Sequence, residues 1–477
     1  MLTKKFMIEN IDIKNLNIEK ASEMLRDGKI TSVSLVEACL KNITERNGEL
    51  NAILEVFSDA LENAKKADEM IARGEGDQLT GIPLVIKDNI FITGKKVSAS
   101  SKILENYVAS YDAFVIEKLK KSGAVFIGRA NMDEFAMGSS TENSAYGPTK
   151  NPFDITRVPG GSSGGSACSV AAGFCLGALG TDTGGSIRQP ASFCGLVGMK
   201  PTYGGVSRRG TIAMSSSLDQ IGPITKTVED AKIIFTTIVG KDSMDATSID
   251  LNSTGSDISG AKIGIPRDWL KEGIDTDVME NFNASVEKLK KLGYEIVDID
   301  LPYSKYSLAV YYILMPAEVS TNLSRIDGIR YGNRVEGENI FDTYKKSRSA
   351  GFGMETRRRI ILGSYVLSHG YYDAYYNKAW KVRHAIEKEF EDIFKKVDFV
   401  LTPTTPSVAF KFGAKKDPLQ MYLSDIFTVP ANIAGIPSLS VPSGFSKEGL
   451  PYGIQFMAPL CADEKLFEIS LELEENI

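Results

Sequence analysis

Histidine is scarce in this sequence, and long apolar runs are missing from it. His369 and His384 are the two histidines among 477 residues, and neither belongs to an H-x-x-x-H or H-E-x-x-H pattern. This scarcity disfavours zinc sites built from histidine and Ser-His-Asp triads. No stretch reaches the ~18 uninterrupted apolar residues of a membrane helix, and the first residues lack the apolar core of a signal peptide. We therefore expect a cytoplasmic protein that does not engage a membrane.

Cysteine is also sparse. Cys39, Cys168, Cys175, Cys194 and Cys461 form an odd set without a C-x-x-C pair. Such a set fits neither a disulfide framework nor a thiolate zinc site. We expect these thiols to be buried as small core side chains.

Basic residues are not in excess either. The chain has 55 lysines and arginines against 61 acidic residues, and the two signs are mixed along it. A protein that grips nucleic acid by itself usually carries a basic patch or stripe. The composition, 43% apolar and 24% charged, indicates a compact globular protein.

The order of the expected elements indicates an α/β fold. Residues 17–73 have helical patterns that end at Gly28 and Gly48, followed by a third helix over 59–73. Short β-prone runs then alternate with helices from 81 to 132, and this alternation returns after residue 261. We expect residues 1–75 to form an N-terminal helical layer within the same domain as an α/β unit over 76–477.

One polar stretch, 242–260, has little periodicity. It could be a linker between two domains or an excursion over the surface of one. We interpret it as an excursion, because the strands expected after it look like additions to the same sheet.

The segment 158–201 is the most unusual part of the chain, because hydroxyl residues crowd around Gly-Gly pairs in it. Glycine is expected where main chain must approach a ligand closely. A phosphate-binding loop would need G-K-[ST], or G-x-G-x-x-G after a strand, and neither is present. The alternative is an oxyanion hole, in which successive N–H groups of Thr183, Gly184, Gly185 and Ser186 point at one developing charge. Ser186 would then be the nucleophile.

Three motifs resemble a known family. They are G-G-S-S-G-G-S at 160–166, G-T-D-T-G-G-S-I-R-Q-P at 180–190 and G-I-P-L-V-I-K-D-N at 81–89. Together they resemble the amidase signature, and the resemblance spans nearly the whole chain. It implies one large mixed β-sheet covered by helices on both faces. It also implies a Ser-Ser-Lys triad of Ser186 as nucleophile, Ser162 after a cis peptide bond with Gly161, and Lys87 as base.

The implied chemistry requires a buried lysine. A lysine acts as a base when its ammonium form is disfavoured, and burial among neutral groups has that effect. Lys87 should therefore be desolvated. Asp182 and Arg188 flank the nucleophile, and we interpret them as a structural ion pair rather than as catalytic groups.

Segments outside the signature resemble the A subunit of tRNA-dependent amidotransferases, for example 133–152, 217–225 and 422–442. This resemblance implies that glutamine is the amide donor. It suggests Arg358 for the substrate carboxylate and Asp425 for its ammonium. Arg357 and Arg359 remain alternatives, since neighbouring helical residues point about 100° apart. Asp425 could instead cap the segment that follows it.

The same resemblance implies two other subunits in a heterotrimer. The partner that amidates Glu-tRNA(Gln) would hold ATP and magnesium and make most of the contact with tRNA, so we expect no cofactor or metal in this chain. A free-standing amidase acting on a small or peptide carboxamide is the alternative function. An inactive scaffold is a second alternative, which the presence of Lys87, Ser162 and Ser186 disfavours.

Overall fold

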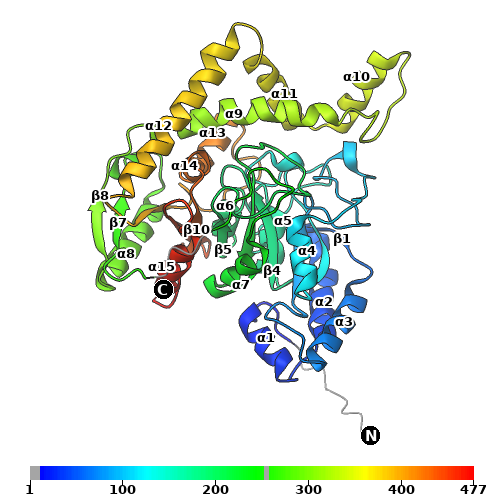
Figure 1. Ribbon diagram of the computed structural model, residues 1–477, viewed down its shortest axis with the longest axis vertical. Coiled ribbons are helices and arrows are strands. Elements are labelled where there is room, and N and C mark those ends of the chain that lie inside the picture. Colours follow the sequence, from blue (N-terminus) through cyan, green and yellow to red (C-terminus); the bar gives the residue numbers. More distant parts are fainter. Residues whose placement is uncertain (1–10, 252–256, 477) are drawn as a thin grey trace.

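One mixed sheet of 11 strands forms the centre of the computed structural model, which describes residues 11–251 and 257–476 (Figure 1). The strand order is β1-β3-β2-β4-β6-β5-β10-β11-β9-β7-β8. The predicted α/β class with one large mixed sheet is confirmed. The strands are β1 Ile53–Val56, β2 Pro83–Lys87, β3 Val125–Ala130, β4 Gly177–Asp182, β5 Val197–Lys200, β6 Gln220–Thr225, β7 Lys262–Ile265, β8 Glu295–Asp298, β9 Phe399–Pro403, β10 Ser438–Phe445 and β11 Pro451–Met457.

Helices lie on both faces of this sheet. Gly177 and Gly180 of β4 point to opposite faces. A Cβ at Gly177 would touch Ile234 of α7, Val228–Ile238. A Cβ at Gly180 would meet Ser163 and Ile187, the residues that precede α5, Gly164–Ala171, and α6, Arg188–Phe193. The α-helices are α1 Ile18–Arg26, α2 Ser32–Leu50, α3 Ala60–Ala72, α4 Phe114–Lys121, α5 Gly164–Ala171, α6 Arg188–Phe193, α7 Val228–Ile238, α8 Thr276–Lys291, α9 Ser307–Asn322, α10 Ile340–Gly351, α11 Met354–Val366, α12 Lys378–Ile393, α13 Pro418–Tyr422, α14 Val429–Ile433 and α15 Asp463–Glu474. Of these described helices, none is long and apolar enough to cross a bilayer.

The central strands are buried on both faces. Every residue of β2, β3, β4 and β6 is buried, and β2 pairs in parallel with β3 and β4. A strand covered on both faces reads as a continuous apolar run rather than as an alternating one, which is the pattern of 83–86. Lys87, the last residue of β2, is the exception to that apolar run.

The N-terminal region differs from the prediction in one element. The helices expected between 17 and 73 are present, and α2 begins with a capping box at Thr31. Between α2 and α3, however, Ile53–Val56 forms β1, which pairs antiparallel with β3 at the edge of the sheet. Four residues between two helices give too little pattern for a strand to be recognised. Residues 1–10 of the expected helical layer lie outside the described residues.

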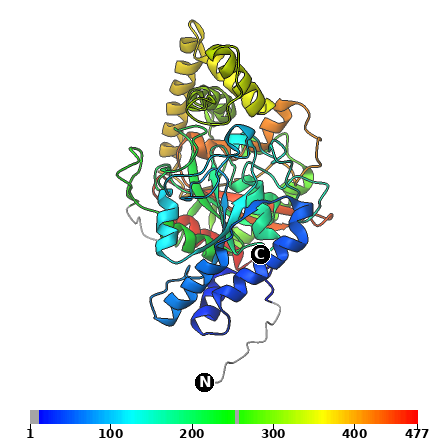
Figure 2. The same ribbon diagram turned by 90° about the vertical axis from the view of Figure 1, so that its right-hand side faces the viewer.

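Residues 307–393, from α9 to α12, form a helical cap on the side of the sheet opposite α1–α3 (Figures 1 and 2). Within the cap, α11 packs closely on α9: a Cβ at Gly363 would lie 1.8 Å from the carbonyl oxygen of Pro316. Glycine is therefore required there for the two helices to approach each other.

The polar stretch 242–260 packs against the body of the protein where the structure describes it. Asp242 and Asp245 pair with Arg209 and Arg208, and the N–H of Ile249 donates to Gly204. The strands β7 and β8 that follow it belong to the same sheet, in agreement with a surface excursion. Residues 252–256 lie outside the described residues.

Candidate active site

The Lys87 ammonium group lies at the end of β2 inside a shell of hydroxyl and carbonyl oxygens. Its Nζ is 2.8 Å from Ser162 Oγ, 2.7 Å from Ser163 Oγ, 2.9 Å from Thr181 Oγ1 and 3.2 Å from the Thr181 carbonyl oxygen. The side chain is fully buried. The structure therefore brings together Lys87 and Ser162, the predicted base and the predicted bridging serine, which are 75 residues apart in the sequence.

Burial sets the charge of this lysine. It lowers the pKa of Lys87 to about 7, against the opposing charges of Asp133, Asp182 and Asp219. None of these carboxylates makes a direct ion pair with Nζ in the described part of the chain. A large fraction of the side chain is therefore uncharged near neutral pH, as a base requires.

Ser162 follows a cis peptide bond with Gly161, as expected. Its carbonyl accepts from the N–H of Asp133 at 3.2 Å, and Asp133 Oδ2 accepts from the N–H of Thr141 at 2.9 Å. A Cβ at position 161 would lie 2.2 Å from Asp133 Oδ2. Burial raises the pKa of Asp133 to about 6. The buried carboxylate thus fits against the main chain of the serine loop.

Ser186 lies beside this loop, at the end of the turn after β4. Its carbonyl accepts from the N–H of Ser163 at 3.2 Å, and 8% of the residue is exposed. Within the described residues no hydrogen bond joins the Ser186 hydroxyl to that of Ser162. The main-chain bond from Ser163 to Ser186 places the two segments side by side.

The turn before Ser186 carries the four N–H groups predicted to form an oxyanion hole. Those of Thr183, Gly184 and Ser186 donate to no acceptor in residues 11–251 and 257–476, whereas that of Gly185 donates to Asp182 Oδ1 at 2.8 Å. Three of the four predicted donors are therefore free in this structure, and the carboxylate of Asp182 occupies the fourth.

Two neighbours explain the glycines of this turn. A Cβ at Gly184 would lie 2.8 Å from the ring of Tyr311 on α9, and one at Gly185, which has φ +130°, would lie 2.2 Å from Thr428 Oγ1. The Thr428 hydroxyl also donates to the Gly184 carbonyl at 2.6 Å. Side chains would displace both contacts, so glycine is needed at 184 and 185.

Asp182 and Arg188 form the buried ion pair that the sequence suggested. Arg188 donates through Nε and Nη2 to the two carboxylate oxygens, each at 3.1 Å, and both side chains are fully buried. Burial opposes ionisation of Asp182, but Arg188 and Asn432 outweigh it and lower the pKa of the carboxyl to about 2. The pair fixes both ends of the turn 183–187, which carries the predicted nucleophile Ser186 and is called the nucleophile turn below.

Asp425 ends the short helix η7, Leu423–Asp425, and approaches the nucleophile turn through Thr428. Its Oδ2 accepts from the Ser139 hydroxyl at 2.7 Å, so the side chain does not cap the following helix, whose N-cap is Thr428. Burial raises the pKa of Asp425 to about 7, against the charges of Arg359 and Lys415. The carboxylate can accept a further donor.

The structure brings Arg359, not Arg358, toward Asp425. The Arg358 side chain is 44% exposed and pairs with Glu355 on the surface of α11. Arg359 is buried, donates to Glu355 Oε1 at 2.8 Å, and lies 5.5 Å from the ring centres of Tyr312 and Tyr422. Of the three consecutive arginines, Arg359 alone is buried, whereas Arg357 and Arg358 are exposed.

The sequence did not single out several polar groups of this site. Ser163 and Thr181 contact Lys87 directly, while Asp133 and Asp219 support the surrounding loops. Ser163 and Thr181 lie within the glycine-rich motifs, so their position in the sequence could have identified them as site residues. Asp133 and Asp219 lie in the segments 133–152 and 217–225, whose resemblance gave no role to either residue. In the described part of the chain, no group of three or more His, Cys, Asp or Glu side chains could hold a metal ion.

Comparisons with known proteins show the family of this chain. The family model described as Amidase matches residues 34–467. The A subunit of glutamyl-tRNA(Gln) amidotransferase from Thermoanaerobacter pseudethanolicus is 49% identical over 475 residues, covering 98% of this chain and 97% of the relative. That of Syntrophus aciditrophicus is also 49% identical, with 98% of each chain covered.

Solved structures give the same fold. The crystal structure of the glutamyl-tRNA(Gln) amidotransferase A subunit from Thermotoga maritima has a TM-score of 0.80 and 42% identity, covering 98% of this chain and 96% of that one. The native peptide amidase from Stenotrophomonas maltophilia has a TM-score of 0.81 and 28% identity, with 97% of each chain covered.

Proposed function

Because the chain belongs to the amidase family, we propose that Lys87, Ser162 and Ser186 form the glutaminase site of a tRNA-dependent amidotransferase. The observation that carries the proposal is a fully buried lysine amine 2.8 Å from the Ser162 hydroxyl, beside a serine on a glycine turn with free N–H groups. The high identity to amidotransferase A subunits along the whole chain supports this function over a free-standing amidase. Fold similarity alone does not, because a peptide amidase shares it equally.

Hydrogen-bond counting indicates which way the proton moves. A neutral amine has two N–H donors and one lone pair. The Thr181 carbonyl can only accept, and the Ser163 hydroxyl donates to that carbonyl at 3.2 Å, so Ser163 Oγ and Thr181 take the two N–H groups of Lys87. The lone pair of Nζ is then left for a hydroxyl proton. The hydroxyls of Ser162 at 2.8 Å and Thr181 at 2.9 Å both reach it, and we assign it to Ser162, whose loop lies beside Ser186.

Acylation follows from this arrangement. Ser186 Oγ forms a bond to the amide carbon of the substrate while its proton passes to Ser162, and the Ser162 proton passes to Lys87. The carbonyl oxygen becomes an anion near the free N–H groups of Thr183, Gly184 and Ser186. When the C–N bond breaks, the proton returns through Ser162 to the departing nitrogen, and ammonia leaves. Water then hydrolyses the ester and releases glutamate.

Free glutamine has a carboxylate and an ammonium that must both be paired on burial. We assign the ammonium to Asp425 and the carboxylate to Arg359. The assignment replaces Arg358, whose exposed side chain pairs with Glu355. The rings of Tyr312 and Tyr422 stack with their centres 3.8 Å apart. The guanidinium carbon of Arg359 lies 5.5 Å from each ring centre, so the two rings support this side chain.

The released ammonia would serve a partner chain. In this proposal two further subunits complete a heterotrimer, and the one that amidates Glu-tRNA(Gln) holds ATP, magnesium and most of the tRNA contact. The chain itself then needs glutamine and no metal for its half-reaction.

The decisive experiment uses the chain assembled with its partner subunits. Ser186→Ala should abolish glutamine-dependent amidation of Glu-tRNA(Gln) but leave ammonia-dependent amidation intact, because the two sites lie on different chains. Ser169→Ala is the matched control, since that hydroxyl donates to the Gly165 carbonyl in α5. Mass spectrometry of the wild type with glutamine should find a glutamyl adduct on Ser186. Loss of both activities in Ser186→Ala, or full glutamine-dependent activity, would contradict the proposal.

A further inference from the structure

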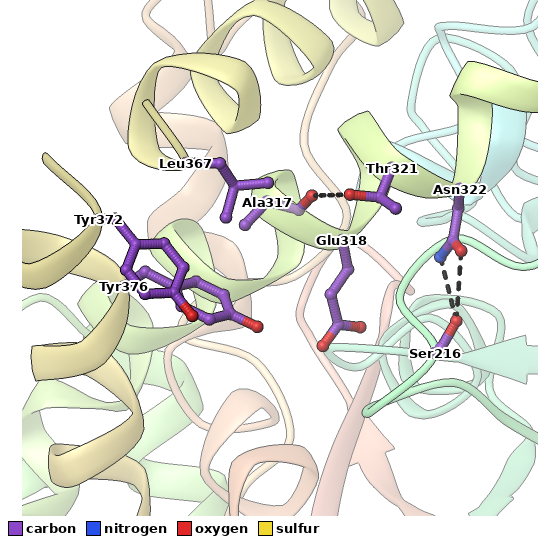
Figure 3. A pocket seen from close by; sticks show the side chains of 8 residues that line it. All are labelled: Ser216, Ala317, Glu318, Thr321, Asn322, Leu367, Tyr372 and Tyr376. Atoms are coloured by element: carbon purple, nitrogen blue, oxygen red, sulfur yellow. Dashed lines mark hydrogen bonds between the residues drawn. The ribbon is translucent and has the colours of Figure 1, made fainter. Parts of the chain in front are cut away.

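A pocket with polar and apolar walls lies between α9 and the π-helix η6, Tyr372–Asn377 (Figure 3). Its volume is about 310 Å³, and its walls include Ser216, Glu318, Asn322, Leu367, Tyr372 and Tyr376. None of the residues assigned to catalysis or to glutamine lines it. The pocket is therefore lined by residues distinct from those of the proposed glutaminase site.

Two tyrosines form one wall. Tyr372 and Tyr376 lie one turn apart on the π-helix η6, Tyr372–Asn377, with ring centres 5.1 Å apart and planes inclined by 29°. Trp380 continues the row, its ring centre 6.3 Å from that of Tyr376. The faces of aromatic rings carry negative electrostatic potential and attract cations.

Glu318 supplies a carboxylate. Its Oε2 is held by the Ser215 hydroxyl at 2.7 Å and by the N–H of Ser217 at 2.9 Å. Its Oε1 accepts no hydrogen bond within residues 11–251 and 257–476, and the side chain points into the space between Ser216 and Tyr376 (Figure 3). One carboxylate oxygen is therefore fixed and the other is available.

No cation within the pocket satisfies this carboxylate. None of the lining residues is basic. The nearby Arg383 donates to Glu387 at 3.0 Å and to the Ser217 hydroxyl at 3.0 Å, and Arg325 donates to Asn322 at 3.4 Å. A single carboxylate is too few ligands for a metal ion, and an anion would be repelled. A cationic organic group fits both the carboxylate and the rings.

The shape and surroundings favour a guanidinium on a protein. A planar guanidinium can stack on tyrosine and donate to a carboxylate at the same time, which a point-like ammonium does less well. Tyr371, Tyr372 and Tyr375 around the pocket are each about two-fifths exposed, at 39%, 42% and 43%, and a macromolecule would cover them. We propose that this pocket receives an arginine side chain of a partner protein. This inference rests on the proposed function, because that function supplies the partner chain.

The test uses tryptophan fluorescence, because the chain has two tryptophans and one of them reports on the pocket. Trp269→Phe leaves Trp380 as the single reporter beside Tyr376. Methylguanidinium chloride should change its emission saturably. Glu318→Gln, which keeps an oxygen for Ser215 and Ser217, should weaken that binding about tenfold, since a charge-assisted hydrogen bond is lost. Tyr372→Leu should weaken it about threefold.

Asp373→Asn is the matched control, because Asp373 is an acid on the same π-helix that pairs with Asn377 and does not line the pocket. This variant should bind methylguanidinium as the parent does. An absent or non-saturable signal, or equal binding by Glu318→Gln, would overturn the proposal.

The partner is tested separately by assembly. Glu318→Arg should weaken assembly with the two other subunits at least tenfold, measured by size-exclusion chromatography across a dilution series, and assembly at wild-type affinity would overturn the assignment to a partner. Glutaminase activity of the wild-type assembly, together with methylguanidinium binding by the Trp269→Phe parent, distinguishes the two proposals. If methylguanidinium does not bind but glutaminase activity is intact, the arginine pocket alone is rejected. If methylguanidinium binds but glutaminase activity is absent, the proposed function alone is rejected.

Discussion

The Thr183 hydroxyl donates a hydrogen bond of 2.6 Å to Asp219 Oδ1, which ties the start of the nucleophile turn to a buried carboxylate. Asp219 also accepts from the N–H groups of Met214 and Ser215. Burial raises the pKa of Asp219 to about 6. The segment 214–219 is therefore held by Asp219 on one side and by Glu318 on the other.

Asp219 is a positioning residue in this arrangement, and its substitution should affect turnover. Asp219→Asn should lower kcat about tenfold with little change in KM, less than the ~100-fold or more expected when an oxyanion donor itself is lost. Thr183→Val should behave alike, and the double variant should be no worse than either, because both break the same contact. Steady-state glutaminase kinetics measure this. Ser207→Ala, whose hydroxyl donates to Asp242 at 2.8 Å, should leave kcat unchanged.

The rate should depend on pH through Lys87. Its folded-state pKa of about 7 lies below the ordinary lysine value, so lowering the pH through 7 protonates the base and removes activity. We expect kcat to rise about tenfold per pH unit below 7 and to level off above it. Profiles between about pH 5.5 and 9 check this. Lys87→Arg should be inactive throughout, because guanidinium stays protonated. A flat profile would exclude Lys87 as the base.

The two neighbouring arginines of α11 should separate in a kinetic test. Arg359→Lys removes the planar contact with carboxylate and tyrosines and should raise KM for glutamine by about tenfold or more. Arg358→Lys exchanges one exposed cation for another and should leave KM within about twofold. Saturation kinetics of both variants decide the assignment. A larger rise in KM for Arg358→Lys than for Arg359→Lys would assign the substrate carboxylate to Arg358.

The buried ion pair should matter for stability. Arg188→Met leaves the Asp182 charge unpaired in the interior and should lower the free energy of unfolding by about 3–5 kcal/mol. Asp27→Asn, which breaks the exposed pair with Lys29, should not shift the unfolding midpoint measurably. Urea denaturation followed by circular dichroism measures both. Equal midpoints for the two variants would contradict the role given to Asp182 and Arg188.

The sequence was sufficient for buried strands such as β2, although not for β1, and its motifs were sufficient to propose the triad. Uninterrupted apolar runs such as 83–86 can only be buried strands or helices, and the flanking glycine and proline select a strand. Lys87, Ser162 and Ser186 stand in motifs long enough to be recognised. Their mutual distances were not predictable, because they depend on the parallel pairing of β2 with β4.

The choice among Arg357, Arg358 and Arg359 shows where local sequence pattern stopped being sufficient. Helical geometry says that one of three consecutive arginines faces inward, but tertiary packing decides which. Gly363, one turn after Arg359 on the same face, approaches Pro316 closely, and that glycine was the available signal. The roles of Asp133 and Asp219 could not be read from local pattern, since they depend on the approach of Gly161 to Asp133 and of the Thr183 hydroxyl to Asp219.

The pairing of β2 with β4 separates reaction chemistry from substrate choice. Lys87 and the nucleophile turn leave adjacent strands of one ladder, so the sheet fixes their spacing, whereas Arg359 belongs to the helical cap. Redesign of the cap should therefore yield hydrolases for other amides that keep the same proton relay. The cap, rather than the glycine-rich segment, is the part to vary when a new specificity is sought.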